Sequence, residues 1–315
     1  MHCLFKVNAN KVDFPILKYS PREYVYFAHS LITDHQTKKF ISDVDHISVV
    51  SKDSFQDELI NIEYVNPSEV MRAYTVSRIL ETKPMDFMIN NQLMKLDLEN
   101  QKKPMLEQET GWVEPYREIG GSYYYTLPRL KTTGILKLGD KKLPVKGMSW
   151  MDHQWSNTKF NAHVNWTWFS IQLENNVDIV VAKVGLEDKI PKLFVTVMYA
   201  DQTQQSFKDQ EIVLTPANVQ WTSPVTKAEY TIAWNLEIPG AGVSLYLEPV
   251  VKEQEMLFGL VHYWEGPIRA TGTYKGEKIF GDGFQELVGY HKHISNTELL
   301  GREFADELKS LFTQG

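Results

Sequence analysis

The segment that decides the fold reads Gly147-Met148-Ser149-Trp150-Met151-Asp152-His153-Gln154-Trp155, and a second aromatic segment, Trp166-Thr167-Trp168-Phe169, follows it. Both segments have the residue types of β-strands. Four tryptophans this close together are typical of strands that line a cavity or pack inside a barrel. Asp152 and His153 are the polar exceptions, so the function depends on whether these two residues do chemistry or stabilise a packed core.

Length and composition indicate a folded protein with room for a large core. The 315 residues suffice for two ordinary domains or one large all-β domain. Hydrophobic residues make up 43% and charged residues 23%, which predicts a globular, soluble chain rather than a disordered one. The net charge of -7 disfavours nucleic acid as the main partner.

The N-terminal residues and the single cysteine bear on the cellular compartment. Cys3 is the only cysteine, which rules out an intramolecular disulfide framework. No run of about 18 apolar residues predicts a transmembrane helix. Residues 1–10 lack an apolar segment after a basic start, so we expect a cytoplasmic protein, or a chain that begins after a removed signal.

Short apolar segments separated by turn residues recur along the chain and predict an all-β fold. Residues 135–145 give the clearest hairpin signal, around a Gly-Asp turn, and residues 166–184 predict another hairpin. Residues 228–238 alternate strictly enough to predict one strand with an apolar face. At the C-terminal end, a capping box at residues 295–298 predicts the start of a single amphipathic helix.

Several motifs between about residue 20 and residue 295 together resemble a known family. They are Gly121–Tyr125 with Pro128-Arg129, Gly147 with Trp150–Trp155, Trp166 with Trp168–Ser170 and Gln172-Leu173, Tyr263–Gly266, and Gly283–Leu287 with Gly289-Tyr290. With these motifs the chain is similar to the AttH-like and carotenoid 1,2-hydratase-like proteins, which have two lipocalin-like domains and are related to fungal Diels–Alderases.

The resemblance implies two consecutive lipocalin-like antiparallel β-barrel or sandwich domains with a C-terminal helix. We expect the first domain to span residues 1–187 and the second to span residues 188–315. It also implies a cofactor-independent enzyme of the hydro-lyase or cyclase/isomerase type. Its substrate would be an apolar isoprenoid or polyketide-like small molecule, hydrated or cyclised in a cavity near the domain junction.

Strand geometry separates the two polar residues of the first aromatic segment. On a regular strand Met151, His153 and Trp155 share one face, while Trp150, Asp152 and Gln154 share the other. Asp152 and His153 therefore cannot both face one cavity unless a β-bulge intervenes. Which face of this strand lines the cavity is the open question.

The chemistry assigns a role to each candidate residue. Hydration needs a proton for an alkene carbon, and aromatic faces can stabilise the resulting cation, whereas cyclisation needs mainly a shaped apolar cavity. We expect His153 to be the acid or base, Trp155 a wall for the cation or substrate, and Asp152 an orienting group or second acid. The expected substrate contacts are Tyr124, Trp150, Trp166, Trp168 and Glu265.

A non-catalytic binder or carrier of a hydrophobic small molecule is the alternative. His153 would then be a hydrogen-bonded core histidine, and Asp152 would bind backbone amides. We expect no cofactor and no metal, because His291 and His293 supply only two of the three or more protein ligands that zinc takes. The expected partner is an apolar small molecule, without nucleic acid or stable membrane insertion, and the sequence leaves the oligomeric state open.

Overall fold

The structure is a computed structural model that describes residues 1–8, 24–54, 59–65, 76–156, 164–258 and 261–290. These residues form an all-β protein with two large antiparallel sheets, which confirms the predicted fold class. Contacts within the chain divide it into two compact units. Unit 1 contains residues 1–34, 39–161 and 198–206, and unit 2 contains residues 35–38, 162–197 and 207–315.

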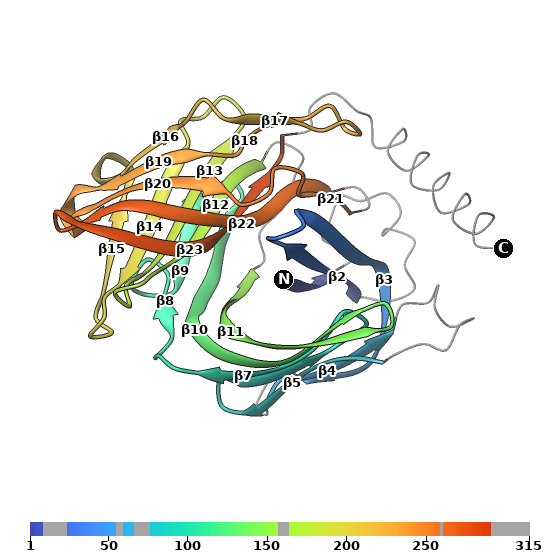
Figure 1. The fold of residues 1–315 in the computed structure, drawn as a ribbon. Coiled ribbons are helices and arrows are strands. Elements are labelled where there is room, and N and C mark those ends of the chain that lie inside the picture. Colours follow the sequence, from blue (N-terminus) through green and yellow to red (C-terminus); the bar gives the residue numbers. More distant parts are fainter. Residues whose placement is uncertain (9–23, 55–58, 66–75, 157–163, 259–260, 291–315) are drawn as a thin grey trace. The chain divides into compact units, whose positions relative to one another are not determined.

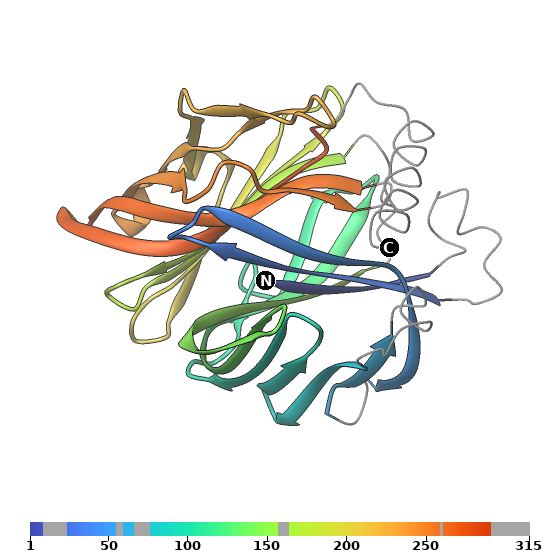
Figure 2. The same ribbon diagram turned by 45° about the vertical axis from the view of Figure 1, so that its right-hand side comes forward.

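Unit 1 contains an 11-stranded curled sheet with the order β1-β2-β3-β4-β5-β6-β7-β10-β11, in which β8 and β9 also pair with β10 (Figures 1 and 2). The strands are β1 His2–Asn8, β2 Tyr24–Asp34, β3 Lys39–Ser54, β4 Asn61–Val65, β5 Ser77–Lys83, β6 Asp86–Asn90, β7 Met94–Asn100, β8 Met105–Leu106, β9 Trp112–Tyr116, β10 Gly120–Leu138 and β11 Lys141–Ser156.

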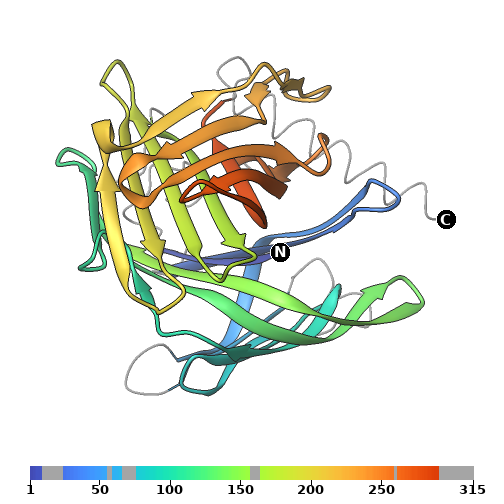
Figure 3. The same ribbon diagram turned by 60° about the vertical axis from the view of Figure 1, so that its left-hand side comes forward.

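Most strands of unit 2 belong to a 10-stranded sheet with the order β15-β14-β13-β12-β23-β22-β20-β19-β16, in which β21 pairs with β22, and the unit also contains a 2-stranded sheet of β17 and β18. The end of β14 and residues 204–206 of β15 are counted with unit 1. Figure 3 shows β12, β13 and β14 side by side in this sheet. The strands are β12 Val164–Leu173, β13 Asp178–Leu186, β14 Lys192–Met198, β15 Gln204–Lys208, β16 Val213–Pro216, β17 Gln220–Thr222, β18 Glu229–Thr231, β19 Trp234–Ile238, β20 Val243–Pro249, β21 Glu255–Phe258, β22 Val261–Tyr274 and β23 Glu277–Val288. Two short 3₁₀ helices, η3 Asp209–Glu211 and η4 Pro239–Ala241, complete the described elements. Among them, none is a helix long and apolar enough to cross a membrane.

The predicted hairpin at residues 135–145 is confirmed as the turn between β10 and β11, the two longest neighbouring strands of unit 1. Gly139 takes the positive φ of 59° that a two-residue hairpin turn requires. The pairing then runs from Leu138↔Lys141 to Ser122↔Ser156. The first aromatic segment therefore lies on β11, hydrogen-bonded along its length to β10.

A β-bulge interrupts this hairpin at one point. Leu127 pairs with Met151, but the next pair joins Leu130 to Ser149, so β10 contains one more residue than β11 here. Leu127 and Leu130 are both fully buried in one apolar cluster, although strict alternation would place them on opposite faces. The bulge thus changes which residues of β10 face the core of unit 1.

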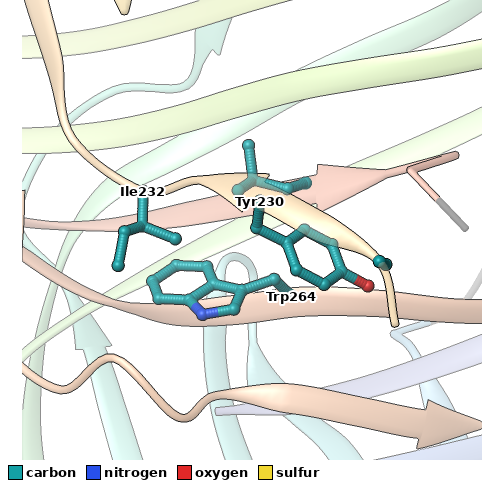
Figure 4. Close-up of a cluster of buried hydrophobic side chains, with 5 residues drawn as sticks. Tyr230, Ile232 and Trp264 are labelled. Atoms are coloured by element: carbon teal, nitrogen blue, oxygen red, sulfur yellow. The ribbon is translucent and has the colours of Figure 1, made fainter. Parts of the chain in front are cut away.

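The core of unit 2 includes a cluster around Tyr230, Ile232 and Trp264, which Figure 4 shows in contact. The apolar face predicted for residues 228–238 is confirmed, since Ala228, Tyr230, Ile232 and the following alternate residues are buried. The prediction of one continuous strand is wrong. β18 pairs with β17 and β19 pairs with β16 and β20, so the segment changes sheets at Ile232 and Ala233.

The second predicted hairpin is also confirmed, as β12 and β13, but its sheet is not the one expected. β12 pairs with β23 from Trp166↔Val288 to Leu173↔Gly281, so both strands belong to the sheet of unit 2. The predicted boundary at residues 187/188 thus lies within unit 2, whereas the contacts divide the chain near residue 161. The predicted C-terminal helix and the His291–His293 pair lie outside the described residues.

Gly134 of β10 gives a stability prediction for the hairpin. It has a φ of 153°, and a Cβ there would overlap the carbonyl oxygen of Lys95 on β7. We expect Gly134→Ala to lower the free energy of unfolding by about 1–3 kcal/mol, measured by thermal and chemical denaturation. Gly147→Ala is the matched control, because nothing lies within 4 Å of a Cβ at that position. Equal stabilities of the two variants would contradict the close approach of β7 and β10.

Candidate active site

His153 of β11 and Tyr125 of β10 form a hydrogen-bonded pair in unit 1. They are directly opposed across the strands, and the His153 Nδ1 lies 3.1 Å from the Tyr125 hydroxyl oxygen. Their rings meet edge to face, with centroids 5.3 Å apart. Both side chains are half-buried. The His153 Nε2 makes no hydrogen bond within the described part of the chain and can meet a ligand.

The surroundings hold this pair uncharged near neutral pH. Burial lowers the pKa of His153 below its ordinary value, and the negative charge of Glu81 partly opposes that effect. Burial, followed by the same Glu81 charge, raises the pKa of the Tyr125 phenol. A neutral imidazole next to a protonated phenol is a suitable proton acceptor and donor pair.

Glu81 of β5 is a site residue that the sequence analysis did not identify. One carboxylate oxygen accepts from the backbone N–H of Met85 at 2.6 Å, and the other accepts from the backbone N–H of Ile60 at 3.0 Å. Ile60 and Met85 pack on the same apolar cluster as Tyr125 and Met151. The two amides therefore fix the Glu81 carboxylate, whose charge acts on the His153–Tyr125 pair.

Glu81→Gln should lower the pKa of the His153 ring further, because the substitution removes the charge that favours the imidazolium. The pKa can be followed by NMR titration of the His153 ring signals. Glu99→Gln removes a charge from an exposed ion pair with Lys131 in the same unit and serves as the control. The side-chain amide introduced by Glu81→Gln would also place a donor against one of the two backbone amides, so thermal unfolding should be measured in parallel. A His153 titration identical to wild type would show that Glu81 does not act on the imidazole.

Asp152 lies on the opposite face of β11 from His153, as strand alternation predicts. Its Oδ1 accepts from the Thr126 hydroxyl at 2.6 Å and from the Trp150 indole N–H at 3.0 Å. Thr126 is fully buried, and its hydroxyl also lies 3.2 Å from the carboxylate of Glu107. Asp152 itself is exposed. These contacts suit an orienting role on this face, and the structure shows no bulge within residues 151–156 that would bring Asp152 to His153.

The predicted site residues of unit 1 therefore separate onto two faces of one hairpin. His153 and Trp155 share a face, with ring centroids 4.9 Å apart. Tyr124, an expected substrate contact, pairs with Gln154 and lies with Trp150 and Asp152 on the other face, away from His153. Its neighbour Tyr125 is the tyrosine that meets the imidazole.

The remaining predicted residues, Trp166, Trp168 and Glu265, belong to unit 2. Trp168 and Glu265 both pair with Glu286, on neighbouring strands of the sheet. The Trp166 indole N–H donates to Glu286 at 2.5 Å. Burial raises the pKa of Glu265 to about 8, so this carboxyl keeps its proton at neutral pH. Trp166, Trp168 and Glu265 are thus grouped around Glu286, but they belong to a different unit from His153.

A hollow of about 270 Å³ is present in unit 1. Charged and polar groups make up most of its lining, and no predicted site residue contributes to it. The lining residues are Thr82, Asp86, Phe87, Asp97, Leu98, Glu99, Lys131 and Thr133. This composition does not suit an apolar substrate.

Fold and motif residues together define the class of protein. The model of the AttH-like family matches residues 3–290, and the chain belongs to this family. Among curated proteins it is similar to the dehydratase asqC of Emericella nidulans, with 22% identity over 230 residues. That match covers 68% of this chain and 62% of the relative, so the chain spans less than two thirds of the relative's length.

Two solved structures share the fold. An AttH-type protein from Nitrosomonas europaea superposes with a TM-score of 0.68 and 18% identity, covering 86% of this chain and 83% of that one. Kievitone hydratase from Nectria haematococca gives a TM-score of 0.65 and 18% identity, covering 85% and 81%. At these identities the likeness establishes the fold alone.

Proposed function

We propose that this protein adds water to, or removes water from, an apolar small molecule, with His153 as the proton-transferring group. The observation that carries the proposal is the hydrogen bond between the His153 Nδ1 and the Tyr125 hydroxyl. It fixes the imidazole while leaving the Nε2 available. The names of two relatives, a dehydratase and a hydratase, support this reaction class over cyclisation.

The proposed dehydration proceeds with one base. The Nε2 of neutral His153 takes a proton from a carbon next to a carbonyl group of the substrate. The electron pair of that C–H bond forms the new C=C bond as the C–O bond of the neighbouring hydroxyl breaks. The imidazolium returns its proton to the departing hydroxyl, which leaves as water. Hydration is the reverse sequence, and neither direction uses a cofactor.

Tyr125 and Glu81 support the two states of His153. When the Nδ1–H donates to the phenol oxygen, the Nε2 has a free lone pair and is the base. When the phenol donates to the Nδ1, the Nε2 carries the proton, so the same hydrogen bond is compatible with either tautomer. The Glu81 charge stabilises the imidazolium that forms during proton transfer.

Glu265 is the proposed alternative acid, with Trp166 and Trp168 as substrate contacts in unit 2. It is buried and keeps its proton at neutral pH, as a general acid must. Two variants distinguish His153 from Glu265 as the proton-transferring residue. Loss of turnover in Glu265→Gln with normal turnover in His153→Gln would place the chemistry in unit 2.

The proposal can be tested without knowing the natural substrate. The purified protein would be incubated in isotopically labelled water with a panel of β-hydroxy carbonyl compounds and conjugated enones, and with kievitone, which the name of a structural neighbour suggests. Mass spectrometry would detect the gain or loss of one water and the incorporation of label. We expect at least one panel member to be converted faster by wild type than by His153→Gln.

Two results would count against the proposal. Tight binding of panel compounds without any conversion would favour the non-catalytic carrier. Formation of a new ring with no change in mass would favour a cyclase.

A further inference from the structure

Three aromatic side chains of unit 1, Trp112, Tyr123 and Trp155, form an exposed row, here called the aromatic row. Trp112 meets Tyr123 edge to face at a centroid distance of 4.9 Å. Tyr123 stacks on Trp155 at 5.6 Å with an interplanar angle of 23°. Their exposed fractions are 39%, 51% and 49%. Large aromatic side chains this exposed and this contiguous are typical of a binding surface.

The aromatic row leads directly to the His153–Tyr125 pair. Trp155 lies 4.9 Å from the His153 ring and 6.2 Å from the Tyr125 ring, centroid to centroid. Beyond the pair, Leu127 is fully buried in the core of the unit. Along one face of β10 and β11, the exposed rings of the row are therefore followed by the half-buried acid–base pair and then by buried core residues.

Gly121 leaves the space that the Trp112 ring occupies. The Trp112 ring lies so close over Gly121 of β10 that any Cβ at this position would overlap it. Only glycine allows the indole to lie against the strand next to Tyr123. The row is thus held by backbone as well as by ring contacts.

Charge sets a further condition on the ligand. The three rings of the row are uncharged, and Glu81 places a negative charge near the pair at its inner end. A carboxylate or phosphate at that end would be repelled. A neutral hydroxyl or carbonyl group can instead bond the free nitrogen of His153.

We propose that the aromatic row binds a flat, conjugated, uncharged part of the substrate by stacking, with a hydroxyl or carbonyl group of the same molecule at His153 and Tyr125. This inference rests on the proposed function and names its substrate class. Offset stacking on Tyr123 and Trp155 would align the ring plane with the row. The polar group would then reach the Nε2 of the imidazole.

Binding of β-naphthol, a flat bicyclic phenol, tests the inference against decalol, its saturated counterpart of similar size. Binding would be followed by NMR of the indole N–H signals, assigned with single Trp→Phe variants. We expect naphthol to shift the signals of Trp112 and Trp155 and to bind about tenfold more tightly than decalol. Trp155→Ala and Gly121→Ala should each weaken naphthol binding by about 2- to 12-fold. Phe280→Ala, an exposed aromatic of unit 2, should not.

Three outcomes would overturn the inference. They are equal affinity for decalol, naphthol-induced shifts confined to other tryptophans, and shifts of Trp112 and Trp155 that follow protein concentration without ligand. The last would identify the row as a contact between two copies of the chain. The His153→Gln variant keeps the two proposals apart, since it should lose turnover yet still bind naphthol. Normal turnover by His153→Gln would contradict the proposed function but would not contradict the stacking site.

Discussion

His153→Gln is expected to lower kcat of the hydration or dehydration reaction by about 10²- to 10⁴-fold, the usual contribution of a general acid–base group. Glutamine preserves much of the size and polarity of the imidazole but cannot take up and return a proton. The measurement is steady-state turnover of the substrate identified from the panel. The fold should be preserved, because His153 is half-buried at the end of the exposed row.

Three further variants test the role assigned to His153. Tyr125→Phe removes only the hydrogen bond to the Nδ1 and should reduce kcat by about 2- to 12-fold. His35→Gln makes the same substitution at an exposed turn residue and is the matched control. If Asp152→Asn abolishes turnover while His153→Gln does not, the chemistry lies on the opposite face of β11.

The pH profile of the wild type adds an independent check. The base in the proposed dehydration is neutral His153, whose pKa burial places below the ordinary value of 6.5. Activity should therefore be retained through neutral pH and fall as the pH decreases through that lowered pKa. An activity that instead falls as the pH rises through about 8 would point to Glu265 as the acid, since its pKa is about 8.

Trp264→Ala is expected to destabilise unit 2 by about 3–5 kcal/mol, the cost of truncating a large aromatic side chain in a core. Trp264 is fully buried against Ala228, Tyr230, Ile232 and Leu287. Its indole N–H donates to the Lys252 carbonyl at 2.7 Å, so the substitution also leaves that oxygen without this donor. Calorimetry should show a Tm lower by roughly 6–20 °C.

Two further variants serve as controls for Trp264→Ala, one at another tryptophan and one at Trp264 itself. Trp155→Ala removes a ring of the same type that is half exposed, and should cost about 1 kcal/mol or less. Trp264→Phe keeps a ring in the core and provides a milder variant if the alanine variant does not fold. Equal Tm values for Trp264→Ala and wild type would contradict the packing in Figure 4.

The sequence is sufficient to predict features that depend on strand geometry alone. Alternation along one strand separates Asp152 from His153, and the structure shows this separation. The hairpin at residues 135–145 follows from its turn residues. Both are local properties of an extended backbone, for which side chains at even and odd positions point to opposite faces.

Pairing between distant strands could not be predicted in the same way. β12 joins the sheet of unit 2 because it pairs with β23, more than a hundred residues later in the chain. The choice between Tyr124 and Tyr125 depends on the register of β10 against β11, which the sequence does not reveal. Glu81 lies on β5, far from the aromatic segments in sequence, and no motif marks it.

The β-bulge between Leu127 and Leu130 has a consequence for how this site could change in evolution or design. Removing one residue, Pro128 or Arg129, would restore simple alternation through β10 without altering any side chain of the site. The pairs Leu127↔Met151 and Tyr125↔His153 would persist, because the deletion removes only the extra residue that opposes Trp150. What would change is the local bend and added twist that a bulge gives its strand. A single-residue deletion, rather than a substitution, could thus alter the angle at which the acid–base pair and the aromatic row leave the core, with every side chain of the site unchanged.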